Sequence, residues 1–506
     1  MNSEQIEILE RQGCWSEDWN RVSISDATDL RKIRNVYFRG NVSIGANAEI
    51  INVPGGLANV RIGASVRIVN VARVERTSGA TFGIGTDVSV LDETGSRPVR
   101  IYPGISSQIA TLAARMPDFA SEKLFPMIDA HVAELPDKPE IGDGANILDC
   151  GDIVDVRIWP GVRVEGARHL RNGSIVNNST NGRPLVFVGN GVDAENFIIE
   201  DGVVSGGALL RNVYVGQGSI VDKGFTAHDS LFFANCSMEC GEACAVLAGP
   251  YTVSMHKSSL LIGAQTSFFN AGSGTNMSNH MYKTGPVHWG VLERGVKTSS
   301  NAYVMHGARI GAYSLVMGDH KNHPDSSEFP FSYLFGDAKG TTTIVPGAML
   351  KSCGLRRDER KWPARDRRLD HGLPLHDRIT FGVLNPYTTG KIRKAIDTIT
   401  TILSDNHPAA TEAPIIYKGL KFSRRHLNQA LALYHSVVGE ETPIQVENEK
   451  YIDLGGLIIP LGLIEKITEA TTLAEVIALM SESSSEIVLP LPADVNPDEV
   501  VYDYPL

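Results

Sequence analysis

The chain has 506 residues, of which 42% are hydrophobic, 21% charged and 7% aromatic, and this composition is typical of a globular protein with more than one domain. Its formal net charge of −11 argues against binding to nucleic acid phosphates, and six cysteines in so long a chain do not make a disulfide framework. Apolar stretches such as residues 454–464 are too short to span a bilayer, and residues 1–11 lack the layout of a signal peptide. We therefore expect a cytoplasmic protein with no nucleic acid partner and no membrane partner.

A short repeat begins after a lead-in segment, residues 1–35. Each unit has six residues: an aliphatic residue, a glycine, two polar or small residues and then a small residue, as at 44–49, 62–67 and 84–89. Units of this kind suit short flat strands whose inward faces fill a narrow interior and whose small residues allow the chain to turn. The sequence therefore predicts an all-β solenoid over residues 36–355.

A segment at residues 104–135 breaks the repeat. Ile105, Ile109 and Leu112 follow each other at helical spacing, as do apolar residues between 124 and 135. We expect a helical insertion between two coils of the solenoid.

The repeat is clearest between residues 262 and 316. Every sixth residue from 266 to 314 is small. The aliphatic row of the same units is interrupted, however, at Gly274, His280 and Pro286. We expect a functional face where this row gives way, within residues 270–324.

These units resemble the repeats of the hexapeptide-repeat family, whose fold is a left-handed parallel β-helix. The resemblance implies that handedness here, and it implies a homotrimer with active sites in clefts between subunits.

The hexads end near residue 355. Apolar residues at helical spacing over 392–403 and 427–438 predict amphipathic helices. We expect residues 356–506 to form a mainly helical C-terminal domain with an extended tail.

The residues around 272–283 also resemble a more specific family. Gly-Ser-Gly-Thr at 272–275 precedes Asn279 and Lys283, as in the acetyltransferase domain of the bifunctional enzyme that makes UDP-N-acetylglucosamine. The resemblance implies that Asn279 and Lys283 contact a phosphorylated sugar or the acyl donor. It implies a coenzyme A thioester as co-substrate, with no bound cofactor.

The chemistry of acyl transfer points to further residues. A base must deprotonate the acceptor, and we assign this role to His280 or His288, although His280 also suits a structural position on the inward row. Asn276 and Asn279 can orient the acceptor, and Arg356 and Arg357 can neutralise phosphate or pantetheine groups of the cofactor. The residues that we assign to substrate binding are Asn276, Asn279, Tyr282, Lys283, His256, His306, His320 and His323.

Two other functions remain open. His288 and His306 are 18 residues apart, or one coil, and the pair resembles part of the histidine zinc site of γ-class carbonic anhydrases. A metal-dependent hydratase or hydrolase is therefore an alternative to the acyltransferase that acts on a sugar or nucleotide sugar. A third hypothesis is a non-catalytic solenoid that binds a carbohydrate or nucleotide sugar.

Overall fold

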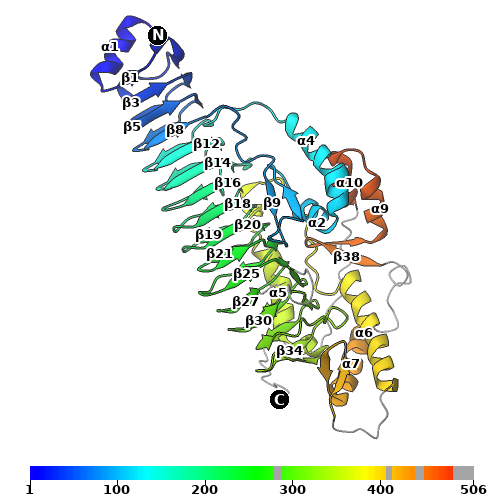
Figure 1. Ribbon diagram of the computed structural model, residues 1–506. Helices are drawn as coiled ribbons and strands as arrows, with labels where there is room; N and C mark the ends of the chain where they lie inside the picture. The colour runs from blue at the N-terminus through cyan, green and yellow to red at the C-terminus, as the bar shows by residue number, and fades with distance from the viewer. Residues whose placement is uncertain (279–287, 406–412, 439–449, 483–506) are drawn as a thin grey trace.

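Short strands stacked in parallel make up most of the molecule (Figure 1). The computed structural model describes residues 1–278, 288–405, 413–438 and 450–482. Ile44 pairs with Ile62 and Ile62 pairs with Ile141, and each of these three residues opens a hexad in the sequence. The prediction of a parallel β-solenoid is therefore confirmed.

The strands that build the solenoid are two to ten residues long. They are β1 (Trp15–Ser16), β2 (Val22–Ile24), β3 (Ile33–Arg39), β4 (Val42–Ile44), β5 (Glu49–Ala58), β6 (Arg61–Ile62), β7 (Arg67–Val69), β8 (Arg73–Glu75), β11 (Asn146–Leu148), β12 (Asp152–Ile158), β13 (Arg163–Glu165), β14 (His169–Val176), β15 (Phe187–Val188), β16 (Asp193–Glu200), β17 (Val203–Val204), β18 (Leu209–Val215), β19 (Ile220–Asp222), β20 (Thr226–Phe232), β21 (Ser237–Glu239), β22 (Glu242–Cys244), β23 (Leu247–Ala248), β24 (Val253–Ser254), β25 (Leu260–Ile262), β26 (Ala264–Thr266), β27 (Asn276–Ser278), β28 (Gly290–Leu292), β29 (Lys297–Thr298), β30 (Tyr303–Met305), β31 (Arg309–Ile310), β32 (Leu315–Met317), β33 (Asp319–His320) and β34 (Tyr333–Gly336), with β35 (Thr342–Val345) antiparallel to β34.

The first end of the solenoid is closed by a helix. Helix α1 (Ser3–Arg11) starts at a capping box in which Asn2 and Gln5 bond each other's backbone amides. Its Leu9 is fully buried and joins the core, so the helix shields the first coil from water.

Asparagine ladders line one corner of the coils. Asn172 donates to Asn196, Asn196 to Asn212 and Asn212 to Asp229, each at 2.9 Å. All four residues have positive φ, between 44° and 54°, a region that asparagine and aspartate tolerate better than other side chains with a Cβ. The ladder thus stabilises both the turn of each coil and the stacking of one coil on the next.

The chain leaves the solenoid after β8 and returns at Ile141. Strand β7 pairs with β11 and β8 with β12, so the stack continues across the excursion without a gap. The excursion carries β9 (Asp87–Ser89), β10 (Pro98–Arg100), α2 (Ser107–Arg115), α3 (Pro117–Phe119), a π-helical turn η3 (Ala120–Leu124) and α4 (Phe125–Ala133). Ser106 begins α2 by accepting a hydrogen bond from the amide of Ile109.

The part of the chain after β35 combines helices with hairpins. Its elements are α5 (Cys353–Ala364), α6 (Pro386–Asp405), β36 (Ile415–Tyr417), β37 (Leu420–Phe422), α7 (Arg424–Val437), β38 (Tyr451–Leu454), β39 (Leu457–Pro460), α9 (Gly462–Glu469) and α10 (Leu473–Glu482), with short 3₁₀ turns η4 (Ala348–Lys351) and η5 (Leu369–His371). Thr343 of β35 pairs with Lys421 of β37, so one hairpin extends the solenoid sheet. The region is therefore less purely helical than the sequence indicated.

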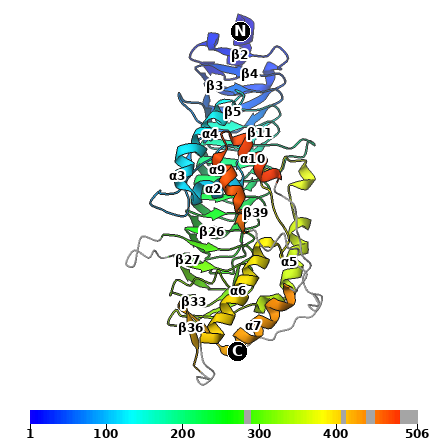
Figure 2. The same ribbon diagram turned by 90° about the vertical axis from the view of Figure 1, so that its right-hand side faces the viewer.

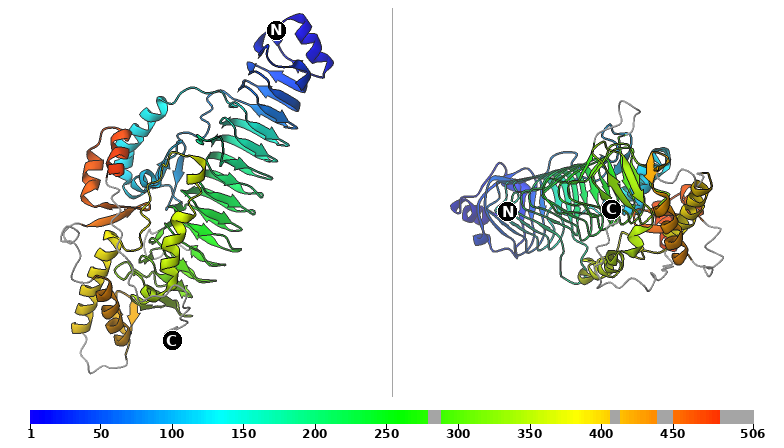
Figure 3. Two further views of the ribbon diagram at one scale, coloured as in Figure 1. Left: turned by 180° about the vertical axis from the view of Figure 1, so that it is seen from behind. Right: turned by 90° about the horizontal axis from the view of Figure 1, so that it is seen from below.

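These C-terminal elements pack along one flank of the solenoid (Figures 2 and 3). Helix α10 contacts α4, and β38 contacts α2, so the excursion and the C-terminal elements lie side by side. The flank and the solenoid wall enclose the site described below. Within the described ranges, no helix has the length and apolar character needed to cross a membrane.

Candidate functional site

The residues assigned to the site from sequence do not come together in one cavity. Four of them lie outside the described residues, namely Asn279, His280, Tyr282 and Lys283. Asn276 is half-buried on β27, where its Oδ1 accepts a hydrogen bond from Ser278 Oγ at 2.5 Å.

Two of the predicted histidines are fully buried. His306 Nε2 lies 2.6 Å from the carbonyl oxygen of Ile262. His320 Nε2 lies 3.1 Å from the carbonyl oxygen of Met317, and its Nδ1 lies 2.8 Å from Thr342 Oγ1. Burial lowers the pKa of His320 to about 4. These contacts are with the protein itself, as expected of interior histidines that support packing.

The other histidines lie apart on the surface of the coils. His256 is exposed, and His323 Nδ1 lies 2.5 Å from the carbonyl oxygen of His306. His288 is half-buried and directly precedes Trp289.

The register around His288 bears on the metal hypothesis. Leu292 pairs with Ile310, so His288 and His306 do lie one coil apart. Across the described ranges, no group of three His, Cys, Asp or Glu side chains is arranged to hold a metal ion. Two imidazoles are fewer than the three protein ligands typical of a catalytic zinc site.

The arginines assigned to cofactor binding lie on α5. Arg357 is exposed, and its Nε lies 3.5 Å from Asp358 Oδ1, while Asp358 also pairs with Lys297. Arg356 is half-buried on the same helix. Neither arginine lines the cavity described next.

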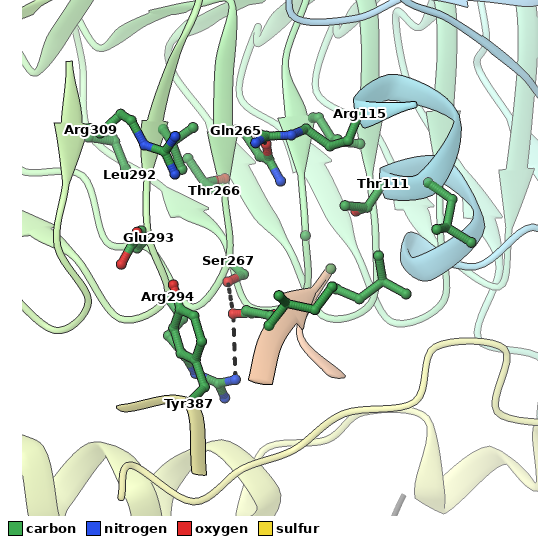
Figure 4. Close-up of a pocket in the computed structure, with 18 of the residues that line it drawn as sticks. Thr111, Arg115, Gln265, Thr266, Ser267, Leu292, Glu293, Arg294, Arg309 and Tyr387 are labelled. Atoms are coloured by element: carbon green, nitrogen blue, oxygen red, sulfur yellow. Dashed lines mark hydrogen bonds and ion pairs between the residues drawn. The ribbon is translucent and has the colours of Figure 1, made fainter. Parts of the chain in front are cut away.

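A cavity of about 440 Å³ lies between the solenoid wall and the flank (Figure 4). Strands β23, β26, β28 and β31 form the wall, and the opposite side comes from α2, α6 and β38. Gln265 shows why β26 contributes: it lies between buried Ala264 and Thr266, so its side chain points away from the solenoid interior. The volume is in the range of sites for small molecules and cofactors.

Two arginines stand at the mouth of this cavity. Arg115, in the last turn of α2, donates from Nη1 to Gln265 Oε1 at 3.1 Å, and Arg309 comes from β31. Partial burial lowers the pKa of Arg115, and the charges of Arg309 and Arg97 lower it further. Among the residues that the structure places, no carboxylate lies within 4.0 Å of Arg115 or Arg309. Glu293, which pairs with Lys391, acts on Arg115 only at longer range, so no described carboxylate forms an ion pair with either arginine of the mouth.

Trp289 holds the side chain of Arg115 in position. The guanidinium carbon of Arg115 lies 4.8 Å from the centroid of the indole ring, and that of Arg97 lies 5.1 Å away. Arg97 is itself anchored by a hydrogen bond of 2.7 Å to the carbonyl oxygen of Ala114. Cation–π contacts of this kind orient a guanidinium without neutralising it.

One ion pair closes the cavity on the side of α6. Lys391 Nζ donates to Glu293 Oε1 at 2.9 Å, and the amide of Ala312 donates to Glu293 Oε2 at 3.1 Å. Burial, then the charge of Glu293, raises the pKa of Tyr387 well above its usual value, so its phenol stays neutral. This side of the cavity is polar but electrically balanced.

A second buried cation ties the flank to the solenoid. Arg294 has no exposed side-chain surface, and its Nη2 donates to the carbonyl oxygen of Thr380 at 2.5 Å. Its Nη1 lies 3.5 Å from Asp453 Oδ2, which also accepts from Ser267 Oγ at 3.4 Å (Figure 4). These contacts fix β38 against the wall.

The cavity can therefore bind an anion that also has an apolar part. Apolar side chains line it between the charged groups, among them Leu112, Leu292 and Leu454. Its described lining contains no histidine, so the cavity itself provides charge, hydrogen bonds and apolar contact but no imidazole base.

Sequence reasoning missed these residues because they come from distant segments. One local signal was present: Leu292 is a row position, yet Glu293 and Arg294 follow it and are both buried. Two adjacent charges that follow an inward aliphatic residue indicate that the outer surface of the coil is itself covered.

A family model described as "Domain of unknown function (DUF4954)" matches residues 1–60 and 47–403. The matched residues include the solenoid, α2 and α6 up to residue 403, whereas β38 lies beyond them. No curated protein matches the chain.

Proposed function

Because the chain belongs to the DUF4954 family, whose description names no activity, we propose a function from the cavity: it binds a sugar phosphate or nucleotide sugar. The observation that carries the proposal is the pair of arginines, Arg115 and Arg309, at the mouth of a cavity with apolar walls. Guanidinium groups bind phosphate through paired hydrogen bonds, and a phosphorylated ligand supplies the charge that the mouth lacks. The apolar walls suit a nucleobase or the ring of a sugar.

We propose acyl transfer to this ligand as the reaction. The predicted general base, His288, directly precedes Trp289 in the sequence, and the guanidinium of Arg115 lies over the ring of Trp289. This proximity along the chain supports His288, rather than a histidine elsewhere on the solenoid, as the proposed base. In this reaction the imidazole takes the proton of an acceptor hydroxyl or amine, the acceptor attacks the thioester carbonyl, and the C–S bond breaks. The thiolate of coenzyme A leaves and is protonated.

The finer features of the fold belong to the same proposal. The hexads support a left-handed coil and a homotrimer, in which a neighbouring subunit would complete the site. Sedimentation or light scattering of the purified protein measures the oligomeric state directly, and a monomer would remove this part of the proposal.

A thermal-shift screen followed by a turnover assay tests the function. The ligands are UDP-N-acetylglucosamine, glucosamine 1-phosphate, coenzyme A, acetyl-coenzyme A and divalent metal ions. The proposal expects stabilisation by a phosphorylated sugar and acceptor-dependent release of the coenzyme A thiol, which is lost in His288→Gln. Stabilisation by phosphorylated sugars without thiol release would favour the non-catalytic solenoid, whereas stabilisation by a metal alone would favour the hydratase.

A further inference from the structure

A second, smaller cavity of about 120 Å³ lies where three distant segments meet. Gly104 and Lys138 come from the two ends of the helical excursion, and Arg157 and Glu200 come from the solenoid wall. His376 comes from the connection between η5 and α6. The cavity is separate from the one lined by Arg115 and Arg309, because the two share no lining residue.

Glu200 is the buried centre of this cavity, with 1% of its side chain exposed. Its Oε2 accepts from the amide of Gly104 at 2.8 Å and from the hydroxyl of Tyr214 at 2.9 Å. Its Oε1 accepts from Asn178 Nδ2 at 2.8 Å. Burial by itself raises the pKa of Glu200, but the charge of His376 and these donors outweigh it, so the net shift is downward. Glu200 is therefore a fixed carboxylate.

His376 is held by this carboxylate. Its Nε2 lies 3.0 Å from Glu200 Oε1, and 22% of its side chain remains exposed. Burial lowers the pKa of His376, but the Glu200 carboxylate outweighs that effect and the net shift is upward. Nε2 forms an ion pair with Glu200, and His376 borders both this cavity and a neighbouring one lined by Leu375 and Arg378, so Nδ1 is the ring nitrogen available to a ligand.

The charges that face His376 come from several elements. Asp201 and Asp377, like Glu200, raise the pKa of the His376 imidazole by their negative charge. Both are buried and accept hydrogen bonds from backbone amides. Lys138 and Arg157 line the same cavity.

Lys138 and Arg157 are close together, and the two carboxylates that act on Arg157, Glu140 and Asp137, both pair with Arg61. Burial lowers the pKa of Lys138, and the nearby charge of Arg157 lowers it further. Lys138 Nζ rests 3.8 Å from the centroid of Trp159, and the guanidinium of Arg157 lies 4.2 Å from that of Phe82. The side chain of Arg157 is only 15% exposed, and its ion pair with Asp137 is long, at 4.0 Å, while Asp137 bonds Arg61 at 2.6 Å.

We propose that this cavity is a binding site for a small oxyanion, with Lys138 and Arg157 binding its charge and His376, oriented by Glu200, donating a hydrogen bond from Nδ1. Two cationic side chains and an imidazole then border a space that fits a phosphate or a short carboxylate but not a nucleotide. Lys138 and Arg157 each lie over an aromatic ring, which positions their charges without neutralising them. An anionic ligand would neutralise these charges. The site is independent of the function proposed for the larger cavity.

Titration calorimetry with inorganic phosphate, sulfate and malonate tests the proposal on the full chain. The expected result is saturable binding of at least one of these anions with one site per chain, and the tighter anion identifies phosphate or carboxylate as the natural group. We expect Arg157→Met and Lys138→Met each to weaken that binding by about tenfold or more. We expect His376→Gln, which can still donate to Glu200 but not also to the ligand, to weaken it by a smaller factor.

Arg163→Met is the matched control, because Arg163 is an exposed arginine on the adjacent strand β13 that already pairs with Glu165. It should bind as the parent does. Lys138→Met serves as the second variant if Arg157→Met does not give the parent's circular dichroism spectrum. Absence of saturable binding to the parent, or equal binding by the parent and a folded Arg157→Met or Lys138→Met protein, would overturn the site. Unchanged binding in His376→Gln would overturn the role of the imidazole.

Discussion

The buried position of His320 predicts a measurable loss of stability in mild acid. A neutral imidazole with its proton on Nε2 can donate to the carbonyl of Met317. Its Nδ1 lies 2.8 Å from Thr342 Oγ1, whose hydroxyl donates to Asn322 Oδ1. Burial lowers the pKa of His320 to about 4 in the folded chain, whereas an unfolded histidine titrates near about 6.5. Below pH 6.5 the unfolded chain therefore binds a proton that the folded chain does not, and folding becomes less favourable.

The magnitude follows from these two values. Between pH 7 and pH 5 the linkage relation gives a loss of about 2 kcal/mol from this one residue, and the loss is complete once the pH falls below about 4. His320→Gln removes the titration, while its amide can still donate to the carbonyl of Met317. The assay is urea-induced unfolding followed by tryptophan fluorescence, for the parent and for His320→Gln, at pH 7 and pH 5. All other titrating groups are common to the two proteins, so the difference between their two pH effects isolates His320.

We expect the parent to lose about 2 kcal/mol more than His320→Gln between these pH values. Equal pH dependence in the two proteins would refute the reasoning, because it would mean that His320 titrates alike in the folded and unfolded chains. A parent that gains stability in acid relative to His320→Gln would show that His320 is held as an imidazolium.

The remaining predictions concern the corner of the coils and the attachment of the flank. Asn196→Ala removes two hydrogen bonds and places alanine at φ 54°, so we expect a loss of about 3 kcal/mol in urea unfolding, and Asn196→Asp, which can still accept from Asn172, should lose less. A ladder that makes no contribution would give equal unfolding curves for all three proteins. Arg294→Met leaves Asp453 without its buried cation, so we expect faster amide hydrogen exchange in β38 and about 3 kcal/mol of lost stability, with partial recovery in Arg294→Lys. Unchanged exchange in β38 would show that this ion pair does not hold the flank.

The solenoid could be predicted because its repeat is local. Each hexad places one aliphatic residue inward and one small residue near a corner, so a row such as Ile44, Ile62 and Ile141 is visible in the sequence without knowledge of the fold. The helical character of α2 was visible for the same reason, from the spacing of Ile105, Ile109 and Leu112.

The larger cavity could not be predicted in this way. Arg115 and Arg309 are both ordinary surface arginines by their local sequence, and only the folding of the excursion against the wall brings them together. The histidines between 270 and 324 drew attention because imidazole is rare in such a repeat. His306 and His320 show that a buried position can also hold an imidazole when backbone carbonyls are within reach.

The most direct test of the central claim is the affinity of the larger cavity for a phosphorylated sugar. Titration calorimetry compares the parent with Arg115→Gln/Arg309→Gln, using UDP-N-acetylglucosamine and glucosamine 1-phosphate, with Arg163→Gln as the surface control. Each lost charge-assisted contact is worth about 1.5–3 kcal/mol, so we predict a Kd at least about a hundredfold higher in the double variant and an unchanged Kd in the control. Equal affinity in the parent and the folded double variant, or no binding of either ligand to the parent, would contradict the account.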